Sequence, residues 1–138
     1  MKIFAKVHPS VALSQLWIFF LFCLFFADFQ WLITADAQNE IASGVVRGHE
    51  VRPELLVFAS IAHLIPVLMV TLARLTVRSV NRWLNIVAGS IVLLMTFDAG
   101  GWDMIDQAVL RIAQILALLL IVYIAWVWKA ESSSEEIE

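Results

Sequence analysis

The stretch WIFFLFCLFF at residues 17–26 decides the fold, because it is a continuous apolar run with no charged residue. It lies inside a longer apolar segment at residues 11–35, and three similar segments follow at residues 54–74, 82–102 and 104–129. A helix needs about 20 mostly apolar residues, at ~1.5 Å per residue, to cross the ~30 Å of bilayer hydrocarbon. A helix also pairs its own backbone groups where no water is present. The sequence therefore predicts an all-α integral membrane protein, a four-helix antiparallel bundle.

The composition excludes a water-soluble globular domain. Hydrophobic residues make up 62% of the 138 residues and charged residues 15%, whereas soluble domains average ~45–50% and ~25%. The net charge of −3 provides no basic field for nucleic acid, so we expect no such partner. The single cysteine, Cys23, excludes an internal disulfide. We expect one four-span domain over residues 1–130 and a disordered acidic tail at 131–138.

Orientation follows from the basic residues in the short loops. With both termini on one side, that side carries Lys2, Lys6, Arg74, Arg78, Arg82 and Lys129, and the opposite side carries Arg47 and Arg52. This bias predicts cytoplasmic N- and C-termini. Trp17 and three other tryptophans are expected near the inner interface, where one edge of each ring contacts water. A signal peptide that is cleaved before Gln38 is the alternative for the first segment.

Two segments carry ionisable residues inside the membrane. Gln107, Arg111 and Gln114 are spaced four and three apart and share one helix face. A polar stripe on an apolar helix must face the bundle. Asp28 and Arg111 both lie ~10 Å, about two helical turns, inside the outer boundary, so we expect them to pair directly or through water. The pair is either an ion pair that fixes how the two helices pack, or a site that binds a proton, a ligand or an anion.

His63 lies near the middle of the second segment, three residues before Pro66, which should kink the helix. His63 is either a core residue whose ring nitrogens have hydrogen-bond partners, or a ligand of a metal or haem. His8 and His49 fall on opposite sides of the membrane, so we expect no metal site, no haem and no other cofactor. Asp98 and Asp106 are alternative partners for Arg111. The candidate intramembrane polar cluster comprises Asp28, His63, Asp98, Gln107, Arg111 and Gln114.

A second cluster marks the inner ends of the middle two segments. Its members are Arg74, Arg78, Asn81, Arg82 and Asn85. The last four share one helical face if the third helix starts early. We interpret the arginines as retaining the topology and contacting anionic lipid head groups. The asparagines are further candidates for helix caps or hydrogen bonds between helices.

Three stretches resemble a known family: ALSQLWIFFLFCLFFADF (12–29), ELLVFASIAHLIPVLMVTLARLTVRSVNRWLNI (54–86) and IAWVWK (124–129). They are similar to small bacterial four-span membrane proteins that are catalogued as a domain of unknown function and loosely grouped with DoxX-like proteins. The resemblance covers residues 8–129, and residues 65–86 together with Ala27-Asp28 are its most specific part. It implies a four-span fold and a bacterial inner-membrane location, but no activity and no catalytic residues. Arg111 and the acidic tail do not belong to that pattern.

The sequence favours a non-enzymatic protein, since it has no Ser/His/Asp spacing, phosphate loop or HExxH motif. We expect it to bind a small polar or lipid ligand in an outward-facing pocket, or to act as an accessory subunit. The alternative is a small oligomeric transporter or channel that uses Asp28 and Arg111. The expected partners are the lipid bilayer and either further copies of the chain or a larger membrane complex. Small residues at Gly89, Ala113 and Ala117 offer surfaces for close helix approach.

Overall fold

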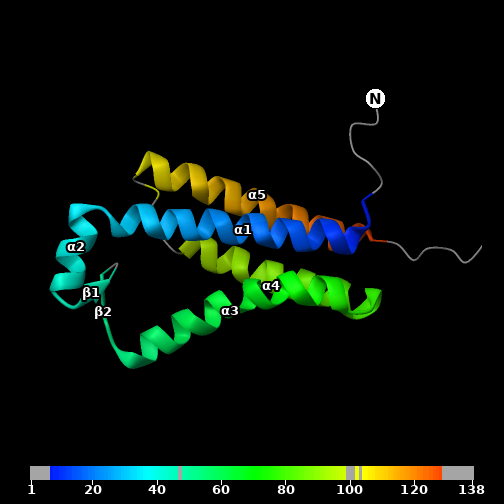
Figure 1. Cartoon of the computed structure of the whole chain (residues 1–138), viewed down its shortest axis with the longest axis horizontal. Helices are drawn as coiled ribbons and strands as arrows, with labels where there is room; N and C mark the ends of the chain where they lie inside the picture. Colours follow the sequence, from blue (N-terminus) through cyan, green and yellow to red (C-terminus); the bar gives the residue numbers. More distant parts are fainter. Residues whose placement is uncertain (1–6, 47, 99–101, 103, 129–138) are drawn as a thin grey trace, which may run out of the picture.

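Four long helices form an antiparallel bundle in the computed structural model, which describes residues 7–46, 48–98, 102 and 104–128 (Figure 1). The long helices are α1 (Pro9–Leu32), α3 (Pro53–Leu75), α4 (Arg78–Asp98) and α5 (Ile105–Val127). All four are long and apolar enough to cross a membrane. The structure thus confirms the predicted all-α fold and indicates a multi-pass membrane protein. The expected tail at residues 131–138 lies outside the described residues.

The connection between α1 and α3 is itself structured, which the sequence analysis did not anticipate. It holds a short helix and a small antiparallel hairpin: α2 (Ala35–Ala42), β1 (Val45–Val46) and β2 (His49–Glu50). The first long helix ends at Leu32, earlier than expected, because Thr34 is extended and caps a new helix. The Thr34 hydroxyl oxygen accepts a hydrogen bond from the backbone N–H of Ala37 at 3.2 Å. A Thr at this position satisfies a backbone donor that would otherwise have no partner.

The starts of the next two helices follow from local chemistry. Pro53 lies in the first turn of α3, where its missing N–H costs nothing, and Glu54 follows where a negative charge complements the helix dipole. Helix α4 begins at Arg78, four residues before the expected start at Arg82. This early start places Arg78, Arg82 and Asn85 on one helix. Their spacing puts them on one face only if the helix begins this early.

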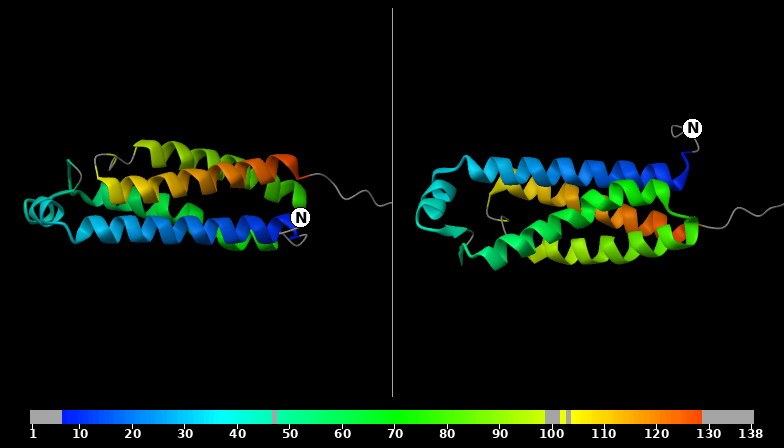
Figure 2. Two further views of the ribbon diagram at one scale, coloured as in Figure 1. Left: turned by 90° about the horizontal axis from the view of Figure 1, so that it is seen from above. Right: turned by 60° about the horizontal axis from the view of Figure 1, so that its bottom comes forward.

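The bundle is a ring in which α1 packs on α5 and α3, and α4 packs on the same two helices (Figure 2). One end carries α2, β1 and β2, and we call it the hairpin end. The other end carries the start of α1, the end of α5 and the link between α3 and α4, and we call it the terminal end. There the rings of His8 and Trp128 meet edge to face at 5.6 Å. Toward the hairpin end α3 slants away from α1 (Figures 1 and 2).

The hydrophobic core is unevenly distributed along the bundle. Its fully buried members are Leu13, Trp17, Phe20, Met69, Ala73, Val92, Ala117, Leu118, Ile121 and Ala125. On α3 the buried residues are Pro66, Met69 and Ala73, all in the C-terminal half, and none of residues 53–65 is fully buried. The core is therefore tight toward the terminal end, whereas the first half of α3 packs loosely.

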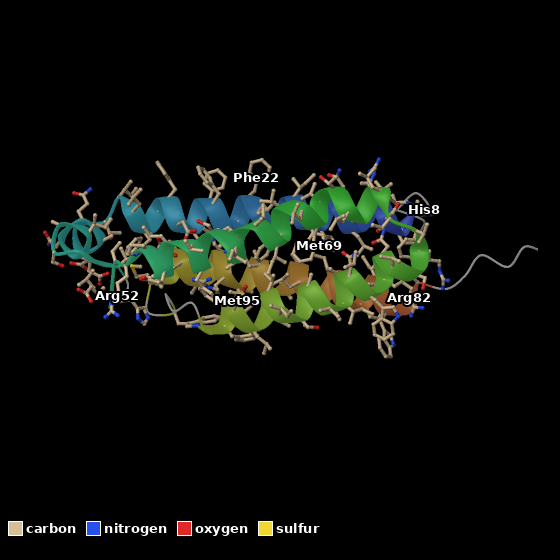
Figure 3. All side chains as sticks on the ribbon, turned by 90° about the horizontal axis from the view of Figure 1, so that it is seen from below. His8, Phe22, Arg52, Met69, Arg82 and Met95 are labelled. Atoms are coloured by element: carbon tan, nitrogen blue, oxygen red, sulfur yellow. The ribbon has the colours of Figure 1, made fainter. Side chains whose placement is uncertain are left out.

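The outer surface of α1 is strongly apolar. Phe19, Phe22, Phe25, Phe26 and Phe29 are each about half exposed or more. Phe22 projects from α1 away from the other helices (Figure 3). A continuous surface of this kind is unfavourable in water and matches the hydrocarbon of a bilayer.

Close approach of α4 and α5 uses one of the small residues that the sequence singled out. A Cβ atom on Gly89 would lie 2.9 Å from Cγ2 of Val122, so any larger residue would require the Val122 side chain or one of the two helices to shift. Ala117 is also buried in the core. Both residues therefore serve packing within the chain, where close contact replaces the hydrophobic drive that lipid cannot supply.

Candidate functional site

A cavity of about 150 Å³ lies between the four helices, and its α3 wall is near the middle of that helix. Its wall is made by Phe20, Leu24, Ala62, His63, Pro66, Val92, Met95, Thr96 and Arg111. Most of these side chains are apolar, and three are polar. An apolar cavity of about this size can hold a molecule such as benzene. The site is thus large enough for a small organic molecule.

Pro66 shapes the α3 wall of this cavity. Proline has no N–H, so the carbonyl group of Ala62, four residues earlier, loses the hydrogen bond that a helix normally provides. Both residues line the cavity. The break adds a hydrogen-bond acceptor to α3 beside His63.

His63 is held in one tautomer and faces an acid. Its Nδ1 atom lies 2.7 Å from the carbonyl oxygen of Ala59. Because that oxygen can only accept, Nδ1 carries the hydrogen. The other ring nitrogen, Nε2, lies 3.6 Å from Oδ2 of Asp28. The structure therefore joins α1 and α3 through an Asp28–His63 contact, which the sequence analysis did not foresee because depth alone does not show how helices are rotated and tilted.

The Asp28–His63 contact lies near the surface of the bundle. The two side chains are 45% and 54% exposed, respectively. Asp28 is four residues before the end of α1 at Leu32, or ~6 Å along the axis, which is shallower than the expected ~10 Å. A charged group half exposed to hydrocarbon is costly. Contact with water, or with a further polar group, lowers this cost.

The polar stripe of α5 faces the bundle, as its spacing predicts. Gln107, Arg111 and Gln114 are 2%, 3% and 0% exposed. Gln107 donates a hydrogen bond from Nε2 to the carbonyl oxygen of Ala27 at 2.8 Å, which joins α5 to α1. Arg111 also lies on the cavity wall with His63. The predicted pairing of Arg111 with Asp28 stays a prediction.

The two alternative acids lie at helix ends. Asp98 is the last residue of α4, and its side chain lies outside the described part of the structure. Asp106 is exposed in the first turn of α5, where an acid complements the helix dipole. Among the side chains that the structure describes, Asp28 on α1 is the acid that contacts a residue of the cavity wall, through His63.

A different polar network lies toward the terminal end. The indole N–H of Trp17 donates to Oδ1 of Asn85 at 2.8 Å, and Nδ2 of Asn85 donates to Oδ1 of Asn81 at 2.6 Å. Nδ2 of Asn81 in turn donates to the carbonyl oxygen of Ala73 at 2.7 Å. The side chains of Trp17, Asn81 and Asn85 form what we call the asparagine network, and all three residues are fully buried. It ties α1, α4 and α3 together.

The expectation that one edge of the Trp17 ring contacts water is wrong. Its ring is buried in the core, and a buried indole N–H needs an acceptor, which Asn85 provides. Two features of the sequence hinted at this pairing. Trp17 lies within an apolar segment, and Asn85 lies within another. Sequence alone does not show which polar group on another helix lies opposite the ring.

The arginines of the inner cluster fix the end of α5. Arg82 donates from Nε to the carbonyl oxygen of Ala125 at 3.0 Å, and Arg78 donates from Nη2 to that of Trp128 at 2.9 Å. Cations at a helix C-terminus bind carbonyl groups that have no partner in the helix. Arg74 is exposed in the last turn of α3. Contact of this cluster with anionic lipid stays a prediction.

The side chains around the cavity do not resemble a set of metal ligands. Among residues 7–46, 48–98, 102 and 104–128, no group of three or more His, Cys, Asp and Glu side chains could hold a metal ion. The cavity region brings together one histidine and one acid, and its third ionisable group is the cationic Arg111. A guanidinium repels a metal ion and attracts an anion.

Nearly the whole chain, including both polar regions, matches a family model. The match is to the "Family of unknown function (DUF6326)" and covers residues 1–134. The chain belongs to DUF6326. No curated protein and no solved structure matches it. The family has no assigned activity, so the cavity and its lining are the features that point to a function for this DUF6326 protein.

Proposed function

We propose that this DUF6326 protein is a small multi-pass membrane protein that binds a small ligand in the cavity between its four helices. The single observation that carries the proposal is the lining of that cavity. His63, Thr96 and Arg111 share it with apolar side chains from α1, α3 and α4, so all four helices contribute to the lining. Small-molecule sites typically combine apolar walls with a few polar groups that orient the ligand.

The proposal also includes the cellular location of the protein and its orientation in the membrane. The excess of Lys and Arg on the side of the termini supports cytoplasmic termini. The hairpin end would then face outward, and the ligand would enter from that side, near the half-exposed Asp28 and His63. A bacterial inner-membrane location and a looser relation to DoxX-like proteins are part of the proposal.

A transporter is the second candidate, because Asp28 and His63 place ionisable groups on two spanning helices. Such groups commonly mark ion or proton pathways. Four helices rarely enclose a path alone, so this function would require several copies of the chain. A proton-flux assay in vesicles separates it from simple binding. Co-purification of a defined larger partner would instead support a role as an accessory subunit.

The binding proposal is tested with 4-fluorobenzyl alcohol as a probe of suitable size. The protein in lipid nanodiscs should give a separate bound ¹⁹F resonance. Ala62→Leu should abolish that resonance, because Ala62 lines the cavity and the larger side chain fills it. Ser60→Leu is the matched control, since Ser60 is exposed on the same helix. Absence of a bound resonance in the native protein, or its persistence in Ala62→Leu, would contradict the proposal.

A further inference from the structure

We propose that a second site, separate from the cavity, binds a phospholipid with an anionic head group. One acyl chain of this lipid lies in a groove between α1 and α3 on the outer surface of the bundle, and its phosphate pairs with Arg74. Three features carry the inference: the apolar groove, the polar residues at one of its ends and its length. The inference does not depend on the proposed ligand of the cavity.

The first feature is an open, apolar groove of about 570 Å³. Its wall includes Ile18, Phe22 and Phe25 from α1, and Val67, Val70 and Thr71 from α3. Phe22, Phe25 and Val67 are exposed, so the groove opens outward, on the side to which Phe22 projects (Figure 3). Around helices that cross a membrane, such a groove meets hydrocarbon. A flexible acyl chain fills it through many van der Waals contacts.

One hydrogen bond fixes the two walls of the groove relative to each other. The hydroxyl group of Ser14 on α1 donates to the carbonyl oxygen of Val70 on α3 at 2.9 Å. Ser14 is buried, and Val70 is part of the groove wall. The groove is therefore held in shape where it approaches the terminal end.

The second feature is a polar continuation of both walls toward the terminal end. Gln15 is three residues before Ile18, so the two share a face of α1. Arg74 is three residues after Thr71 and seven after Val67, so it shares their face of α3. Gln15 and Arg74 are both exposed. The apolar groove thus leads to an amide on one helix and a guanidinium on the other.

Arg74 suits the phosphate of a lipid head group. It lies in the last turn of α3, where a long arginine side chain keeps its stem on apolar surface and its charge at the level of the head groups. Its guanidinium can donate two hydrogen bonds to one phosphate. Arg78 and Arg82 instead donate to carbonyl groups at the end of α5. Arg74 is therefore the arginine of the inner cluster that shares a helix face with the groove wall.

The third feature is the length of the groove. From Gln15 to Phe25 the α1 wall runs ten residues, or ~15 Å along the helix axis. The hydrocarbon of a bilayer is ~30 Å thick, so one leaflet contributes about half of that. The groove therefore matches one acyl chain in the leaflet whose head groups lie at the terminal end.

The charge at the end of the groove favours a lipid over a second copy of the chain. In a two-fold dimer about an axis normal to the membrane, the same surface of each copy meets the other. The two Arg74 side chains would then lie at the same depth and repel each other. A phosphate in that place attracts the guanidinium instead.

The test places the full chain in nanodiscs of phosphatidylglycerol and phosphatidylcholine in equal amounts. A trace of phosphatidylglycerol with a diazirine on one acyl chain is activated by light, and mass spectrometry locates the adducts. We expect more adducts at Phe22 and Val67 than at three exposed apolar residues outside the groove wall, each within nine residues of the terminal end of its helix: Leu68, Val87 and Leu120. Unlabelled phosphatidylglycerol should compete about fivefold better than phosphatidylcholine, the preference that one basic residue near the head groups provides.

Variants assign the head group and the acyl chain separately. Arg74→Gln should make the two lipids compete equally, whereas Arg52→Gln, at the hairpin end, should retain the preference. Val67→Trp should reduce the adducts at Phe22, because the larger side chain fills the groove. Leu68→Trp is the matched control, since Leu68 is the next residue, is 48% exposed where Val67 is 49%, and does not line the groove.

The outcomes decide each part of the inference. Groove adducts that are no more frequent than those at the control positions overturn the acyl-chain site. Equal competition by the two lipids in the native protein, or a preference that survives in Arg74→Gln, overturns the pairing of the phosphate with Arg74. A lack of groove adducts together with a dimeric particle would show that a second copy covers the groove, and it overturns the lipid site. Binding of 4-fluorobenzyl alcohol in the cavity is measured independently of all these results.

Discussion

At the terminal end, Trp17, Asn81 and Asn85 are fully buried and joined by hydrogen bonds of 2.6–2.8 Å. At the hairpin end, Asp28 and His63 are about half exposed, and they face each other across 3.6 Å near a cavity. Buried polar groups with complete hydrogen bonding make a bundle rigid. The comparison indicates that the terminal end holds the helices in register, and the hairpin end is where we propose that a ligand binds.

Pro66 lies at the boundary between these two regions on α3. After it, Met69 and Ala73 are buried in the core, whereas none of residues 53–65 before it is fully buried. Proline weakens a helix at one position and lets its two halves pack differently. The slant of α3 in Figure 2 therefore has a local cause in the sequence.

The largest predicted effect is at the asparagine network. Asn85→Ala removes the acceptor of the Trp17 N–H and one partner of Asn81. An unpaired buried group costs ~1–3 kcal/mol, so we expect the free energy of unfolding to fall by about 3 kcal/mol. Unfolding in mixed detergent–SDS micelles measures it. Asn39→Ala, at an exposed position on α2, should change stability by less than ~0.5 kcal/mol. Equal effects of the two variants would remove the distinction between the ends.

The next effect tests which groups pair at the hairpin end. Asp28→Asn and Arg111→Gln should each destabilise the protein, and the double variant should be milder than their sum by about 1–2 kcal/mol. The same cycle with His63→Gln measures the Asp28–His63 contact. Additive effects of Asp28 and Arg111 would mean that these two side chains do not meet, and Arg111 would then depend on another acid such as Asp98 or Asp106.

The smallest effect concerns the arginines at the end of α5. Arg82→Gln removes the cation that binds the Ala125 carbonyl, so the last turn of α5 should fray. We expect a stability loss of about 1 kcal/mol and faster hydrogen exchange confined to that turn. Arg52→Gln is the control, because Arg52 pairs with Glu50 in an exposed ion pair at 2.9 Å. Surface pairs of this kind contribute little. Unchanged exchange in Arg82→Gln would show that the arginine does not hold the helix end.

Much of the fold was predictable because it depends on the length of each apolar segment and on residue spacing, both of which are read directly along the sequence. Apolar length gave the four helices, and the four-and-three spacing of Gln107, Arg111 and Gln114 gave their inward direction. The short helix α2 was missed although its signal is present, namely Thr34 as a cap and Asp36 in the first turn. A polar loop and a short amphipathic helix have similar composition, so composition alone favoured the loop.

Contacts between helices were less predictable, because they depend on rotation and tilt as well as depth. Depth suggested Arg111 as a partner of Asp28, which stays a prediction, but depth did not indicate His63, which the structure places beside that acid. The burial of Trp17 was missed for the same reason, since tryptophan is common both at interfaces and in cores. Pro66 predicts a bend in α3, but the direction in which α3 slants also depends on its packing against the neighbouring helices.

The central claim is that the hairpin end opens for a ligand while the terminal end stays fixed. Pulsed electron spin resonance tests it most directly, with spin-label pairs in a Cys23→Ala background in nanodiscs. One pair, at Phe29 and Leu56, spans α1 and α3 at the hairpin end, and another, at Gln15 and Leu75, spans them at the terminal end; all four residues are exposed. We predict a broad distance distribution at the hairpin end that narrows with 4-fluorobenzyl alcohol, and a narrow, unchanged one at the terminal end. Equally narrow distributions that do not respond to the probe would contradict the claim.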